Sequence, residues 1–177
     1  MNHLVRPNSE SNTIIDVTSE LAGWDYLGFK VISLRAGERY SEPTDGNEVA
    51  VVPLRGKARF HSSSEVFDLA RESVFAESPH ILYLPPGETL TVEAEFDFEF
   101  AIGGAPAEGK YPVRLFKPEE MKKEIRGGGA ARRQVNHVLA APLPAERLIL
   151  FEVYVPGGAW SGWPPHCHDG YMGSPYL

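Results

Sequence analysis

The sequence has little of what a membrane protein, a nucleic-acid-binding protein or a secreted protein would need. Its 177 residues contain one cysteine, Cys167, so no disulfide forms within the chain and we expect a reducing compartment. The first residues lack the apolar segment of a signal peptide, and no apolar run approaches the length of a membrane span. A formal net charge of -7 leaves no basic cluster for nucleic acid or an anionic membrane surface. We therefore expect a cytoplasmic protein without nucleic-acid or membrane partners.

Helical periodicity is also scarce. The hydrophobic residues fall in short runs of strand character, separated by the 17 glycines and 15 prolines. Strands are expected at residues 26–34, 48–54, 57–62, 73–78, 80–84, 89–96 and 98–104, with a hairpin at Gly56. Residues 118–125 are the best helix candidate, and an edge strand is the alternative. Many short strands at close spacing predict an all-β antiparallel sandwich or barrel.

A glycine-rich break divides the chain. The segment GGGAARR covers residues 127–133, after which strands are expected at 133–139 and 147–155. We expect residues 1–115 to form one β-barrel domain, residues 116–132 a linker, and residues 133–177 the incomplete start of a second domain. A barrel begun but not closed leaves the strand RLILFEVYV uncovered, so we also expect a homo-oligomer.

The chemistry of the sequence is concentrated in GGAWSGWPPHCHDGYMGSPYL, residues 157–177. In a strand, His166 and His168 point to the same face, while Cys167 points to the other. Two imidazoles at this spacing suit Zn, Fe, Ni, Cu or Mn, although two ligands are too few for a tight site. The alternative is two ordinary histidines near a turn.

The glycine-rich turn before His-x-His resembles the first motif of cupins. The segments RQVNHVL, RLILFEVYVPGGAWSGWPPHCHD and SPYL together resemble the 5-deoxy-glucuronate isomerases of inositol catabolism, which are bicupins related to the 4-deoxy-5-hexosulose-uronate isomerases. This resemblance implies a cupin-type jelly-roll barrel followed by the opening strands of a second barrel. It further implies that His166 and His168 bind a divalent metal, Zn or Mn, and that a small sugar acid undergoes aldose–ketose isomerisation.

In this family a Glu soon after SPYL and a later His complete the metal site. The resemblance therefore predicts that the chain is a fragment of a longer protein, cut inside the second cupin and inactive by itself. The general base of the reaction is left unassigned. The alternative function is a non-catalytic cupin module for sugar binding or assembly.

The first half departs from the cupin pattern. Glu48 occupies the position of the glutamate of a first cupin motif, but no His-x-His precedes it. The segment PPGETL matches the second motif, P-x-G-x-x-H, except that Leu90 replaces the final histidine. We expect residues 1–115 to bind no metal and to have a structural or assembly role.

The remaining polar candidates are weaker. His61, His80 and His137 are read chiefly as satisfied core or surface histidines, and Arg132, Arg133 and Arg147 as solvated cations that could alternatively bind a sugar carboxylate. Glu152 and Tyr154 share a strand face and could point into the second barrel.

Overall fold

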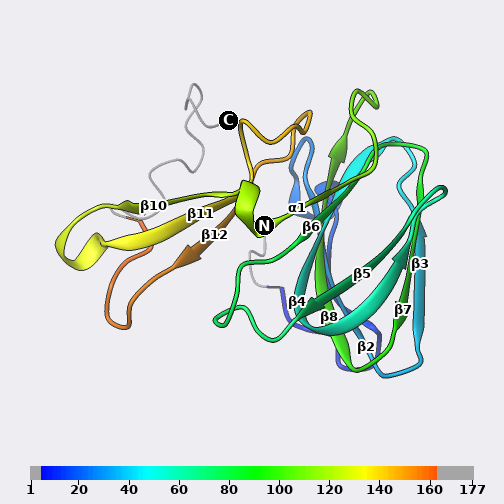
Figure 1. The fold of residues 1–177 in the computed structure, drawn as a ribbon, viewed down its shortest axis with the longest axis horizontal. Helices are drawn as coiled ribbons and strands as arrows, with labels where there is room; N and C mark the ends of the chain where they lie inside the picture. Colours follow the sequence, from blue (N-terminus) through cyan, green and yellow to red (C-terminus); the bar gives the residue numbers. More distant parts are fainter. Residues whose placement is uncertain (1–4, 163–177) are drawn as a thin grey trace. The chain divides into compact units, whose positions relative to one another are not determined.

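The computed structural model describes residues 5–162, and almost all of its regular structure is antiparallel β-sheet (Figure 1). The strands are β1 (Thr13–Val17), β2 (Gly28–Leu34), β3 (Arg39–Pro43), β4 (Asn47–His61), β5 (Val66–Arg71), β6 (Ile81–Leu84), β7 (Thr89–Ala94), β8 (Phe98–Pro106), β9 (Arg114–Phe116), β10 (Lys122–Arg126), β11 (Arg133–Leu139) and β12 (Leu150–Tyr154). The helices are α1 (Ser19–Ala22) and two 3-10 turns, η1 (Pro118–Glu120) and η2 (Gly129–Ala131). Within the described residues, no helix has the length and apolarity to cross a membrane. The all-β prediction is confirmed.

The chain divides into two compact units. The first contains the chain up to Met121 together with Val138–Leu150, and the second contains Lys122–His137 and the residues from Phe151 onward. The predicted domain limits at residues 115 and 132 stay predictions.

The long strand β4 organises the first unit. Its first part pairs with β6 and β8, and its last residues pair with β5 and β7, so the same strand belongs to both walls of the barrel (Figure 1). The bend between the two parts is at Gly56, which has φ 95°. Gly56 also lies so close to the start of β8 that a Cβ atom there would be 2.0 Å from the Asp97 carbonyl oxygen. Only glycine fits this conformation and this approach, so it marks a barrel corner. The predicted hairpin at Gly56 is therefore wrong, because the chain bends there without reversing.

Side chains alternate along β4 between two cores. Val49 and Val51 contact the interior of the barrel, where Phe60, Phe98 and Phe100 lie within a single apolar cluster. Ala50 faces the outer side and packs in a second cluster, which has nine buried members: Ala50, Ile81, Tyr83, Ala105, Phe116, Met121, Val138, Leu139 and Leu148. Because both faces of β4 are covered, its near-continuous valine run is that of a fully buried strand.

The predicted strands at 26–34, 80–84, 89–96 and 98–104 are confirmed by β2, β6, β7 and β8. The predicted strand at 73–78 is wrong, because carbonyl groups in this segment serve the buried Arg71. The Arg71 guanidinium donates to the Glu77 carbonyl oxygen from Nη2 at 2.8 Å and to the Pro53 carbonyl oxygen from Nη1 at 3.0 Å. The region of the helix candidate at 118–125 contains η1 and β10, so its edge-strand alternative is correct for β10.

The second unit is built on a three-stranded sheet in the order β10-β11-β12. Strands β10 and β11 pair antiparallel from Lys122 opposite His137 to Arg126 opposite Arg133. The turn between them contains Gly127, whose φ is 70°. The predicted strands at 133–139 and 147–155 are confirmed by β11 and β12.

Candidate functional site

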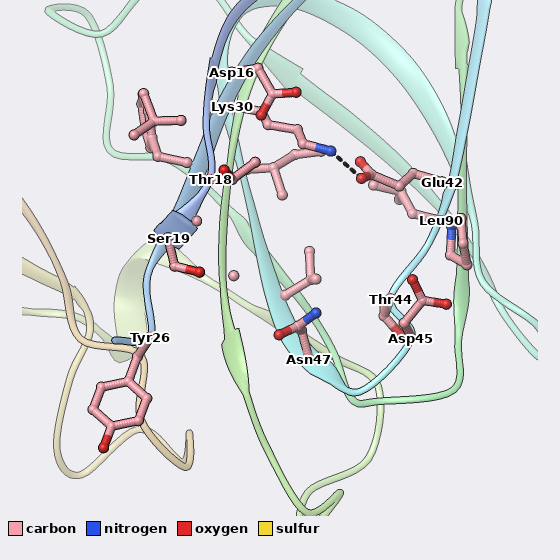
Figure 2. A pocket seen from close by; sticks show the side chains of 17 residues that line it. Asp16, Thr18, Ser19, Tyr26, Lys30, Glu42, Thr44, Asp45, Asn47 and Leu90 are labelled. Atoms are coloured by element: carbon pink, nitrogen blue, oxygen red, sulfur yellow. Dashed lines mark hydrogen bonds and ion pairs between the residues drawn. The ribbon is translucent and has the colours of Figure 1, made fainter. Parts of the chain in front are cut away.

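A cavity of about 230 Å³ lies at one end of the barrel in the first unit (Figure 2). It forms where β2 and β7 begin, where β3 and β8 end, and where β4 starts. Along β2 the inward positions change from Leu34 and Ile32 to Lys30, and along β3 they change from Tyr40 to Glu42. The inner face of the barrel therefore becomes polar at this end.

An ion pair bridges the cavity. The Lys30 ammonium on β2 contacts the Glu42 carboxylate on β3, and Figure 2 shows the two side chains pointing toward one another. Strand β2 pairs with β8, whereas β3 pairs with β7, so the contact joins the two walls of the barrel. The two side chains are 26% and 32% exposed, which places them at the edge of the interior rather than in its apolar part.

The Tyr40 hydroxyl donates a hydrogen bond to the same carboxylate. Burial of the phenol raises the pKa of Tyr40, and the hydrogen bond to Glu42 and the charges of Glu42 and Asp16 raise this pKa further. Tyr40 therefore stays protonated and acts as a donor.

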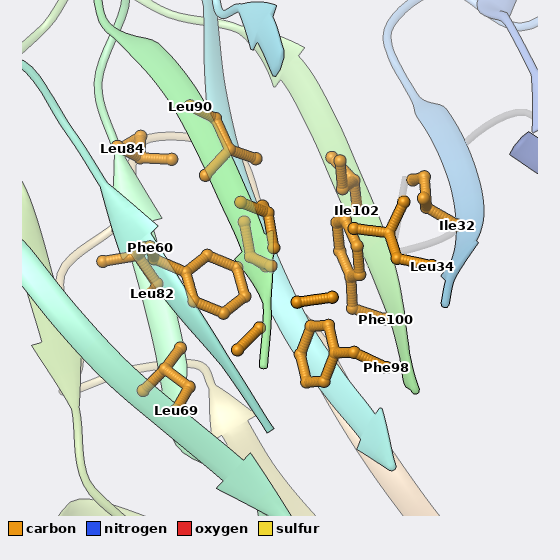
Figure 3. Close-up of a cluster of buried hydrophobic side chains, with 14 residues drawn as sticks. Ile32, Leu34, Phe60, Leu69, Leu82, Leu84, Leu90, Phe98, Phe100 and Ile102 are labelled. Carbon is orange, nitrogen blue, oxygen red and sulfur yellow. The ribbon is translucent and has the colours of Figure 1, made fainter. Parts of the chain in front are cut away.

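Leu90 forms part of the cavity wall and is 2% exposed. It lies directly opposite Glu42 in the pairing of β3 with β7. The position that the P-x-G-x-x-H pattern gives to a histidine therefore does face the cavity, but it supplies an apolar surface. Below the cavity the barrel is filled by hydrophobic side chains, including Leu34, Phe98 and Phe100 (Figure 3).

Glu48 does not belong to this cavity. It lies on the outer face of β4, is fully buried, and accepts hydrogen bonds from the Tyr83 hydroxyl at 3.0 Å and from the backbone N–H groups of Glu146, Arg147 and Leu148 at 2.8, 2.6 and 2.7 Å. Four donors thus solvate a buried carboxylate that has no cation beside it in these contacts. The glutamate of the apparent first motif is therefore a structural anchor for residues 146–148. Sequence reasoning missed this role, because nothing in the local pattern indicates partners so distant in the chain.

Glu146, whose own backbone N–H donates to Glu48, is a second carboxylate held by backbone N–H groups. Its carboxylate accepts hydrogen bonds from the backbone N–H groups of Glu108, Gly109 and Lys110 at 2.9, 2.7 and 2.9 Å. The hydrogen bond from Lys110 and then those from Glu108 and Gly109 hold the pKa of Glu146 below its usual range. Two successive carboxylate anchors therefore fix the segment that precedes β12 onto the first unit.

In the second unit, His137 is engaged by its own sheet. Its Nε2 atom lies 2.9 Å from Oε1 of Glu124 on β10, and its ring meets the Phe151 ring edge-on, with centroids 4.9 Å apart. These two contacts give His137 a structural role in its sheet.

The other candidates are dispersed. His61 lies 3.4 Å from Glu93, Arg147 stacks over the Tyr26 ring at 4.9 Å, and Arg133 donates to the Ala131 carbonyl oxygen. In the second unit the Tyr154 hydroxyl donates to Glu152 at 3.2 Å, so these two side chains do share a face.

The predicted metal ligands His166 and His168 lie outside the described residues. Within residues 5–162, no group of three or more His, Cys, Asp or Glu side chains is placed to hold a metal ion. The residues of the described part therefore do not fit a metal centre.

Comparisons with known proteins identify close relatives of the chain. A model of the KduI/IolB family matches residues 3–174. A 5-deoxy-glucuronate isomerase of Geobacillus thermodenitrificans is 39% identical over 166 residues, which cover 92% of this chain and 60% of that protein. The 5-deoxy-glucuronate isomerase of Geobacillus kaustophilus is 40% identical over 166 residues, which again cover 92% of this chain and 60% of that protein.

The crystal structure of an IolB-like protein from Salmonella typhimurium LT2 superposes with a TM-score of 0.87 at 37% identity, covering 93% of this chain and 64% of that one. The predicted all-β, cupin-type fold is thus confirmed. The chain spans about 60% of the length of the two curated relatives.

Proposed function

The chain belongs to the KduI/IolB family, and we propose that it is part of an isomerase that converts 5-deoxy-D-glucuronate to 5-dehydro-2-deoxy-D-gluconate. The observation that carries this proposal is its 39–40% identity to relatives named 5-deoxy-glucuronate isomerase. Both relatives are longer, so the activity is proposed for the whole protein.

The reaction is an aldose–ketose isomerisation, and it needs no net oxidant or reductant. The proton on the hydroxyl-bearing carbon next to the aldehyde moves to the aldehyde carbon, and the hydroxyl proton moves from one oxygen to the other. A positioned general base carries the carbon-bound proton. No described residue is assigned this role.

For the metal we propose Zn²⁺ or Mn²⁺, bound through His166 and His168 together with further ligands. A divalent metal supplies polarisation of the substrate carbonyl when bound. Two imidazoles alone hold such an ion loosely, so we expect the 177-residue chain to have little or no activity.

The test is an assay of the purified chain with 5-deoxy-D-glucuronate and added Zn²⁺ or Mn²⁺ in D₂O. Proton NMR follows the loss of the aldose signal and the entry of deuterium at the new hydroxymethyl carbon. In parallel, the chain is joined to the part of the Geobacillus thermodenitrificans relative that follows the matched region. We expect turnover by this chimera, with metal content measured by mass spectrometry, and loss of both turnover and metal in His166→Ala and His168→Ala.

A folded, metal-loaded chimera without turnover would contradict the isomerase proposal. Turnover by the 177-residue chain near ordinary enzyme rates, about 10 s⁻¹, would show that the active site is complete within it. Turnover that survives both histidine substitutions would contradict the proposed metal ligands.

A second candidate, a non-catalytic sugar-binding module, is favoured by the polar cavity at the end of the first barrel. The two functions are compatible, because the cavity and the His-x-His motif belong to different parts of the sequence. A chain that binds sugar with unchanged affinity after His166→Ala and His168→Ala would support the second candidate for the first unit.

A further inference from the structure

The cavity at the end of the first barrel has the chemistry of a small-molecule site. Its volume of about 230 Å³ is below the roughly 300–1,000 Å³ of drug-sized sites, so it has room for one small ligand. The wall combines apolar surface from Val49, Leu90 and Ile102 with polar groups from other strands. This mixture fits a ligand that carries both C–H surface and hydrogen-bonding groups.

The charges in the cavity wall disfavour an anion. Among the described residues that line it, Lys30 is the single cationic residue, whereas Asp16, Glu42 and Asp45 contribute three carboxylates. The ammonium of Lys30 is already paired with Glu42. A ligand carboxylate would therefore meet two carboxylates, those of Asp16 and Asp45, whose charges the bridging ion pair does not neutralise.

The hydrogen-bonding groups favour hydroxyls. Ionised Asp16 and Asp45 can only accept hydrogen bonds, Lys30 can only donate, and the Asn47 amide does both. Among the described residues, neither the two aspartates nor the Asn47 amide has a side-chain hydrogen bond. A hydroxyl group both donates and accepts, so several hydroxyls on one ligand match this mixed wall. The wall also tolerates an ammonium group, because the charge of Lys30 is paired with Glu42 whereas Asp16 and Asp45 remain unpaired within the described part of the chain.

We propose that this cavity binds a polyhydroxy compound without a carboxylate, of the size of one monosaccharide, and selects against the corresponding sugar acid. The ligand places its hydroxyls against Asp16, Asp45 and Asn47 and its C–H face against Leu90. The acidic substrate of the proposed isomerisation is therefore disfavoured in this cavity. The inference deepens the sugar-binding candidate and does not depend on the isomerase activity.

The test uses D-glucose, D-glucuronate and D-glucosamine as matched probes. Glucuronate differs from glucose by a carboxylate, and glucosamine by an ammonium group. Each is titrated into the ¹⁵N-labelled 177-residue chain and followed by amide chemical shifts. We expect saturable glucose shifts at residues 28–30, 42–47, 90 and 102–104, and affinities about tenfold or more weaker for glucuronate. Glucose without shifts at these residues, or glucuronate binding there as tightly as glucose, would overturn the proposal, as would glucosamine binding there more weakly than glucose.

Two substitutions locate the binding. Gly104 lines the cavity, and a Cβ there meets nothing closer than 3.7 Å, so the side chain of Gly104→Val should occupy cavity space and abolish the glucose shifts. Its control is Gly128→Ala in the second unit, because a Cβ at Gly128 has no neighbour within 4 Å. Asp45→Asn keeps the shape and removes one charge, so it should narrow the preference for glucose over glucuronate severalfold.

Exposed Glu65 gives the matched charge control, Glu65→Gln, which should change neither affinity. Should Gly104→Val fail to fold by circular dichroism, Asp45→Asn still decides the question, since its side chain is exposed. An unchanged preference in folded Asp45→Asn would contradict the proposed charge selection. Glucuronate shifts confined to other residues would concern the proposed substrate site and leave the glucose site standing.

Discussion

The Glu48 carboxylate accepts a hydrogen bond at 2.7 Å from the backbone N–H of Leu148, a residue one hundred positions later in the chain. This contact joins β4 of the first barrel to the segment that leads into β12. Leu148 itself is buried in the same outer cluster as Tyr83 and Phe116. The first compact unit therefore includes residues from beyond β10 and β11.

Glu48→Gln should lower the free energy of unfolding by about 2–4 kcal/mol. The substitution turns one acceptor oxygen into an NH₂ group, so the buried donors on that oxygen lose their acceptor. Urea unfolding followed by fluorescence measures the change. Tyr83→Phe removes only the neutral donor and should cost about 1 kcal/mol. Equal effects of the two substitutions would show that the backbone donors add nothing beyond the hydrogen bond from Tyr83.

Gly56→Ala should destabilise the barrel by about 2 kcal/mol or more. A Cβ at this position would lie 2.0 Å from the Asp97 carbonyl oxygen, and φ is 95°. Gly46→Ala is the control, since a Cβ there has no neighbour within 4 Å. Chemical denaturation of both variants compares them, and equal stability would argue against a close approach at this corner.

The stability of the second unit should decrease as the pH is lowered, because Glu124 loses its charge. Hydrogen bonds from Lys122, then from His137 and Arg126, lower the pKa of Glu124 to about 2. A lowered folded-state pKa means that the stabilisation is present above the unfolded value of about 4.5 and is lost as the pH falls toward 2.

Glu124→Gln should therefore be less stable than the unsubstituted chain at pH 7, and the difference should shrink between pH 4.5 and pH 2. Thermal unfolding at a series of pH values measures this difference. The control is exposed Glu119→Gln, which should show no such pH-dependent change. A difference that stays constant down to pH 2 would assign the effect to packing rather than charge.

The chain should self-associate through the second unit. Phe151, Val153 and Val155 lie on one face of the segment that contains β12 and are 47%, 43% and 36% exposed. Val153→Glu should shift the mass measured by light scattering toward the monomer. The same substitution at Val66, which is 58% exposed on β5, should not. A monomer at high micromolar concentration before any substitution would contradict self-association.

Local patterns were sufficient for those strands whose hydrophobic residues alternate or run continuously. The inward stripe of β7 and the valines of β4 were both recognisable, because side-chain periodicity depends only on strand geometry. The resemblance of the chain to its family could likewise be read from the segments around β11 and β12. The short strands β1, β3 and β5 were missed: β3 (RYSEP) is largely polar, and the apolar residues of β1 (TIIDV) and β5 (VFDLAR) are too few to show a clear period.

Tertiary structure alone decided the roles of Glu48, Gly56 and Lys30. From the sequence, Glu48 could face the barrel interior or the outer side of β4. It faces the outer side, where the backbone N–H groups of residues 146–148 donate to it. A glycine between two strand-like runs is compatible with a hairpin or with a corner, and only the approach of Asp97 distinguishes them. Lys30 became part of a cavity because β3 brings Glu42 to it across the barrel. Sequence determines periodicity along one strand, whereas partners across a barrel depend on how distant strands are paired.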